Sequence, residues 1–128
     1  MLFRSVKEVV QNKIETVKND ALEKAQLEAD KILAFANIQK EKLIQEAEKL
    51  AEEMRNKAKI SGDELISSAG ENPLKKMAAK TASDKIVKEG DKKANQIVEI
   101  ATKKGDDLVQ KAQLQADEIM LKASETAK

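Results

Sequence analysis

The chain contains no cysteine, no histidine, no tryptophan and no tyrosine among its 128 residues. The absence of cysteine excludes a disulfide framework and leaves the redox compartment unassigned. Without cysteine and histidine, the chain also lacks a strong thiolate nucleophile, the commonest general base and the usual soft metal ligands. We therefore expect a protein that is not an enzyme and that uses no cofactor, no metal and no small-molecule substrate.

The carboxylates are not expected to supply the metal site that histidine and cysteine would otherwise form. The best candidates for a divalent-cation site are the acidic pairs Glu52-Glu53 and Asp106-Asp107. Adjacent side chains on a helix diverge by about 100°, so neither pair is expected to converge on one ion. The glycines form no GxxxxGK or GxGxxG phosphate loop either.

The chain also lacks a charge surplus and a long apolar run. It has 24 basic and 23 acidic residues, whereas nucleic-acid-binding proteins are typically basic, so we expect no nucleic acid partner. No apolar stretch approaches the ~20 residues of a membrane span. The opening MLFRSVKEVV has no apolar segment of a secretory signal. As written, the sequence predicts a cytoplasmic protein, or an exported one if a signal has been removed.

Residues that form turns and globular cores are scarce. There are one proline and four glycines, and the only aromatic residues are Phe3 and Phe35. Charged residues make up 37% of the chain, and the apolar residues are mainly alanine and branched aliphatics. This composition is typical of long helices and coiled coils, and it predicts an all-α protein.

The sequence is built from eleven-residue units, or hendecads. The stretches KAQLEADKI (24–32) and KAQLQADEI (111–119) are visible copies of one pattern. Six hendecads run from Lys7 to Asn72 and four begin at Ser83, with a ten-residue unit between them. Eleven residues over three turns is about 3.67 per turn, so positions one, four, five and eight share one side of a nearly straight helix.

These four positions predict a packing seam. Position four is bulky and apolar in nine of ten units, position five is apolar in eight, position eight is Ala in eight, and position one is small in seven. Small residues let two backbones approach while positions four and five supply bulk. The seam residues that we expect to be buried are, at position four, Ile32, Leu43, Met54, Leu65, Ile86, Ile97, Leu108 and Ile119, and, at position eight, Ala25, Ala36, Ala47, Ala58, Ala101, Ala112 and Ala123.

One segment combines several signals for a turn. Gly70 suits a left-handed helix cap, Asn72 suits an N-cap, and Pro73 suits the first position of a helix. We predict helix one within residues 1–69, from about Ser5 to Ala69, a turn over 70–73, and helix two over 74–128, with Pro73 as its start and Thr126 near its end. The predicted fold is a long antiparallel helical hairpin, coiled-coil-like, with its two seams facing each other.

Two alternatives remain open at this stage. Pro73 could instead kink a single continuous rod. Ser61 and Glu64 fit a weaker break around Gly62, in the same way that Ser5 and Glu8 fit a capping box at the start. Gly62, like Gly90 and Gly105, falls on a small seam position, so we favour packing over a hinge there.

The periodicity and the Ala, Lys and Glu content resemble three groups of eleven-residue-repeat proteins. These are group 3 late embryogenesis abundant proteins, exchangeable apolipoproteins and the hendecad stalk of the ATP synthase peripheral b subunit. The resemblance covers nearly the whole chain but is one of pattern, without a diagnostic motif or a membrane anchor. It therefore implies no functional residue here.

The charges favour a protein surface over a lipid surface as the partner of the seam. Position seven, on one flank, leans basic, with five lysines (Lys13, Lys24, Lys57, Lys111, Lys122) against Glu46 and Glu89. Position two, beyond the other flank, is acidic in eight of ten units. Lipid-binding helices commonly carry lysine on both flanks, so we interpret this asymmetry as suited to a neighbouring helix.

Apolar residues away from the seam either form a second patch that pairs with another copy, which we favour, or are scattered surface residues. They are Leu27, Ile38, Ile60 and Leu114 at position ten, and Phe35 and Ile100 at position seven. We expect a non-enzymatic structural or interaction protein, a helical spacer, stalk or scaffold, whose partner is itself or another helical protein. The alternative is a protein that associates reversibly and weakly with lipid surfaces or protects against desiccation.

Overall fold

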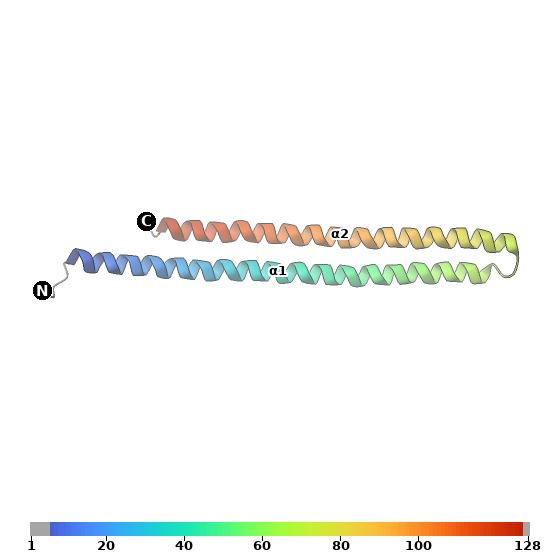
Figure 1. Ribbon diagram of the computed structural model, residues 1–128, viewed down its shortest axis with the longest axis horizontal. Helices are drawn as coiled ribbons and strands as arrows, with labels where there is room; N and C mark the ends of the chain where they lie inside the picture. Colours follow the sequence, from blue (N-terminus) through green and yellow to red (C-terminus); the bar gives the residue numbers. More distant parts are fainter. Residues whose placement is uncertain (1–5, 127–128) are drawn as a thin grey trace. The chain divides into compact units, whose positions relative to one another are not determined.

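The structure is a computed structural model that describes residues 6–126. Its described residues form two helices and no strand: α1 spans Val6–Ser68 and α2 spans Pro73–Thr126. The two helices run in opposite directions and pack against each other (Figure 1). The chain is therefore an all-α helical hairpin, as the sequence predicts, and the alternative of a single kinked rod is wrong.

Contacts divide the hairpin into two units. One unit joins the part of α1 up to Ile38 with the part of α2 from Asp107 onward, and the other spans Gln39–Asp106 and includes the turn. Each unit contains a segment of α1 and a segment of α2. The second unit, 39–106, holds the contacts that define how the two helices face each other.

The end of α1 depends on a left-handed backbone at Gly70. Its φ angle is +66°, the only positive φ among the described residues. The backbone N–H of Ala69 donates to the carbonyl oxygens of Leu65 at 3.2 Å and Ile66 at 3.3 Å, which closes the last turn. No atom lies within 4 Å of the place that a Cβ at residue 70 would occupy. Glycine is therefore required here by backbone conformation and not by space.

The start of α2 depends on Asn72 and Pro73. The Asn72 side-chain oxygen accepts hydrogen bonds from the backbone N–H of Leu74 at 3.0 Å and of Lys75 at 3.4 Å. Its backbone carbonyl accepts the first helical bond, from Lys76, at 2.9 Å. Pro73 has no N–H and a φ suited to the first helical position, so it leaves no donor unpaired. The predicted roles of Gly70, Asn72 and Pro73 are thus all seen in the turn.

The weaker candidate break around Gly62 does not form, in agreement with the packing role that we favour for this residue. α1 continues as a helix through Ser61 and Glu64, and Gly62 is buried against α2. The suggested capping residue Ser5 lies outside the described residues.

Gly70→Ala should lower the free energy of unfolding by about 1 kcal/mol, because an L-residue is strained at a positive φ. Urea unfolding followed by circular dichroism measures the change. Gly70→Asn is the matched control: asparagine tolerates the left-handed region better, so its loss should be smaller. Equal stability of the alanine variant and the wild type would contradict this account of the turn.

Candidate packing and interaction surfaces

The buried centre of the hairpin consists of small residues. All described residues that are less than a tenth exposed are alanine, glycine or serine at repeat positions one or eight: Ala25, Ala29, Ala36, Ala47, Ala51, Gly62, Ser83, Ala94, Ala101, Gly105, Ala112 and Ala116. Ala51 and Ala94 are completely buried, at 0% exposed. Two members of the predicted set, Ala58 and Ala123, are half-buried. The helices therefore meet at their smallest side chains.

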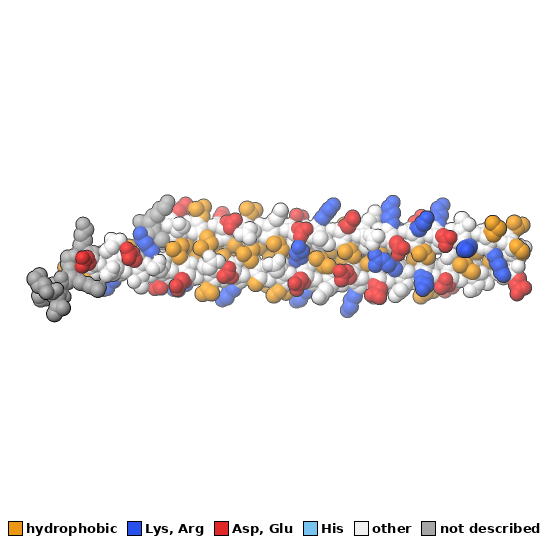
Figure 2. All heavy atoms as spheres, in the orientation of Figure 1, with side chains coloured by type: hydrophobic (Ala, Val, Ile, Leu, Met, Phe, Trp, Pro, Cys, Tyr) orange, Lys and Arg blue, Asp and Glu red, His pale blue; other side chains and the backbone are white. Residues whose placement is uncertain are grey.

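The bulky side chains at position four lie beside this centre and not within it. Six of them are half-buried, namely Ile32, Leu43, Met54, Ile86, Ile97 and Ile119. Leu65 and Leu108 differ from the expectation of burial, since they remain 38% and 39% exposed. Figure 2 shows hydrophobic side chains along much of the line where the two helices meet, interrupted by a few charged ones, with further charged and hydrophobic side chains at the outer edges. Because small residues bring the backbones together, there is no room between the helices for the larger ones.

The glycines of unit 39–106 reveal the register of the two helices. A Cβ built on Gly90 would lie 2.5 Å from the Cβ of Ala58. One built on Gly62 would meet the Ser83 side chain. Position eight therefore faces position eight across the hairpin, and position one faces position one. Helix packing is closest where both partners are small, as in other helix pairs with small residues at the contact.

The same register explains a lysine at a position that is otherwise small. Lys40 occupies position one, and its partner in the register is Gly105. A Cβ on Gly105 would lie only 2.5 Å from Cγ of Lys40. The absence of a side chain at Gly105 thus makes room for the lysine stem, which crosses the partner helix on its way to solvent.

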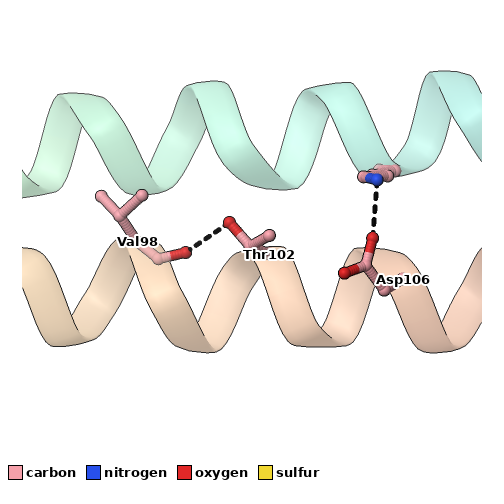
Figure 3. A network of polar contacts seen from close by, with 4 residues as sticks. Val98, Thr102 and Asp106 are labelled. Carbon is pink, nitrogen blue, oxygen red and sulfur yellow. Dashed lines mark hydrogen bonds and ion pairs between the residues drawn. The ribbon is translucent and has the colours of Figure 1, made fainter.

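Polar contacts between the helices are few and exposed. Nζ of Lys40 lies 2.6 Å from Oδ1 of Asp106, whose side chain points from α2 toward α1 (Figure 3). Nη2 of Arg55 donates to Oδ1 of Asn95 at 2.6 Å, and its Nε lies 3.5 Å from Oδ1 of Asp91. The ion-paired side chains are 32–56% exposed, so each pair contributes about 0–1 kcal/mol.

These contacts show which flanks of the two helices come together. Arg55 holds position five, and its partners on α2 hold positions two and nine, all on the same flank of their helices. Antiparallel helices that face each other necessarily place corresponding flanks on the same side. The acidic flank of α1 therefore lies beside the acidic flank of α2. Between α1 and α2, the acidic flank and the lysine-bearing flank therefore do not face each other.

One side of unit 39–106 is consequently acidic. We define the acidic face as positions two, five and nine of this unit. It carries seven carboxylates and two basic side chains: Glu41, Glu48, Glu52, Asp63, Asp84, Asp91 and Asp106, with Arg55 and Lys59. All seven carboxylate residues are exposed.

The opposite side is apolar and of mixed charge. We define the apolar face as positions four, seven and eleven of the same unit. Its exposed apolar residues are Leu50 at 52%, Ile100 at 54% and Leu65 at 38%. Around them lie the half-buried residues of position four, together with three lysines and two glutamates: Lys57, Lys93, Lys104, Glu46 and Glu89. The acidic face has a single exposed large apolar residue, Ile66, at 41%.

The apolar residues predicted to form a second patch are all exposed. Phe35 and Leu27 are 64% and 62% exposed, and Leu114 is 68% exposed. Ile38 and Ile60 at position ten are 51% and 57% exposed, on the side of α1 away from α2. Only Ile100 of this set belongs to the apolar face of unit 39–106.

The carboxylates of residues 6–126 are dispersed along the two helices. No group of three or more acidic side chains is arranged there to hold a metal ion. Neither described helix has a segment apolar enough to cross a membrane. The geometry of the described chain offers surfaces for packing.

Gly90→Ala should destabilise the hairpin even though alanine is the better helix former by about 1 kcal/mol. The added methyl group meets Ala58 and forces the helices apart, at a cost of about 1–3 kcal/mol. Denaturant unfolding measures the difference. The double variant Gly90→Ala/Ala58→Gly exchanges the two residues and should return close to wild-type stability. Stabilisation by Gly90→Ala alone would contradict the close contact.

No protein-family model, curated protein or solved structure matches the chain. The small-residue seam, the acidic face and the apolar face are the features of residues 6–126 that bear on its function.

Proposed function

We propose that this protein is a non-enzymatic helical spacer or scaffold that works by packing long helices against each other. The observation that carries the proposal is the pairing of small residues along the hairpin, from Gly62 opposite Ser83 to Gly105 opposite Lys40. Small residues at regular intervals serve close helix contact. They contribute little to binding a lipid surface, where apolar bulk determines affinity.

The scarcity of chemical groups supports the same proposal. The sequence has no histidine and no cysteine, and its carboxylates lie on exposed helix surfaces. The recurring feature along the chain is instead the eleven-residue spacing, which repeats one packing arrangement every three turns of the helix. A repeated contact of this kind keeps two helices in register and extends a surface along them.

A second candidate function is reversible association with a lipid or drying surface, as in the apolipoproteins and late embryogenesis proteins that the sequence resembles. It is favoured by the exposed apolar residues at position ten, of which Leu27 and Leu114 are 62% and 68% exposed. These residues lie on the helix sides opposite the seam, so a lipid surface could cover them without separating the helices.

Circular dichroism distinguishes the two functions. The scaffold should be strongly helical in buffer, melt cooperatively, and change little when vesicles of phosphatidylcholine and phosphatidylglycerol are added. A lipid-dependent protein should be largely unfolded in buffer and become helical on vesicles or on drying. That second result would overturn the scaffold proposal.

A further inference from the structure

The hairpin leaves its bulky apolar side chains incompletely covered. Its fully buried residues are alanine, glycine and serine, whereas Leu43, Met54, Ile86 and Ile97 are only half-buried. Burial of a leucine or isoleucine side chain stabilises a fold far more than burial of an alanine methyl group. Long helices gain most of their stability from such packing. The four side chains therefore have apolar surface available for a further contact.

Half-buried apolar residues also lie on the acidic side, at position five (Ile44, Val87 and Val98), but the apolar surface extends further on the side of position four. Position four and position eleven share a flank, so Leu50 continues the row of half-buried residues on α1, and Ile100 at position seven continues it on α2. Leu50 and Ile100 are each about half exposed, at 52% and 54%. The apolar face is thus continuous with the seam between the helices. It has three exposed large apolar residues, Leu50, Leu65 and Ile100, whereas the acidic face has one, Ile66.

We propose that a second copy of this chain covers the apolar face, so that two hairpins form a four-helix dimer with both acidic faces outward. This inference rests on the proposed scaffold function and specifies its partner and its contact surface.

Charge determines which side can meet a second copy. Two acidic faces brought together would oppose seven carboxylates to seven, and on each face only Arg55, Lys59 and the Lys40 that pairs with Asp106 compensate them. The apolar face carries Lys57, Lys93 and Lys104 with Glu46 and Glu89, so two copies can place opposite charges around a shared apolar centre. A contact of the apolar face on an acidic face would bury carboxylates against leucine and isoleucine, which is costly.

The closed dimer also accounts for the exposed acidic side. When identical surfaces pack face to face, two copies satisfy each other and assembly stops at a dimer. If the apolar face of one copy packed on the acidic face of the next, each copy would leave a free face and assembly would continue. With the acidic faces outward, the dimer surface carries like charges that oppose further association.

The test compares two isoleucines that differ in position but little in exposure. Ile100→Glu changes the apolar face, and Ile60→Glu, its matched control, changes position ten on α1; the two isoleucines are 54% and 57% exposed. Sedimentation equilibrium over a range of concentrations should show a wild-type dimer. Ile100→Glu should weaken dimerisation at least about tenfold, whereas Ile60→Glu should leave it within about twofold.

Several outcomes would overturn the inference. A cooperative, helical monomer at all concentrations would exclude the second copy while leaving the scaffold proposal intact. Equal effects of the two substitutions would exclude the apolar face, and association that grows without closing would exclude the dimer. Binding of monomers to phosphatidylglycerol vesicles that Ile100→Glu abolishes would assign the face to lipid. A chain that is unfolded in buffer would instead overturn the proposed function itself.

A second measurement covers the case in which Ile100→Glu does not fold. The chain has no cysteine, so Ile100→Cys and Ile60→Cys each introduce a single thiol. The rate of reaction with a water-soluble thiol reagent should fall with rising protein concentration for Ile100→Cys and stay constant for Ile60→Cys. Constant rates for both variants would contradict the proposal.

Discussion

The close approach of two helix backbones at Ala58 and Gly90 is the contact on which the rest of the hairpin depends. No side chain fits at Gly90, because its Cβ would lie 2.5 Å from that of Ala58. Once the backbones are this close, the apolar side chains at position four must lie beside the contact, where they remain half-buried. The same closeness brings the stem of Lys40 against Gly105. A lysine can therefore occupy an otherwise small seam position only because the residue opposite it has no side chain.

The turn could be predicted from sequence because its signals are local. Gly70, Asn72 and Pro73 each act through their own backbone or through a neighbour within three residues, and the structure places each in the expected role. The continuity of α1 through Gly62 was also predictable, since the eleven-residue register passes through that residue unchanged. In both places a local pattern and the overall fold agree.

The degree of burial and the pairing of flanks were not predictable in the same way. A periodic pattern identifies the side of a helix that faces its partner, but not the distance between the helices. That distance decides that Ala51 is fully buried while Leu65 is 38% exposed. The flanks depend on the relative direction of the helices: an antiparallel arrangement places Arg55 beside Asp91 and Asn95 of the corresponding flank. The sequence of one helix shows that its two flanks differ in charge, and the hairpin determines that like flanks lie side by side.

This separation gives the two sides of unit 39–106 different physical properties from one repeated sequence pattern. Position two is acidic on both helices, and an antiparallel hairpin adds the two rows on one side. Position four is apolar on both helices, and the same geometry adds those rows on the other side, although position five also places apolar residues on the acidic side. Parallel helices with the same sequence would instead place an acidic row and an apolar row on each side. In each helix, one flank is acidic and the other is not. Because the chain reverses at Gly70, the two acidic flanks lie on the same side, and the hairpin has one acidic face and one apolar face.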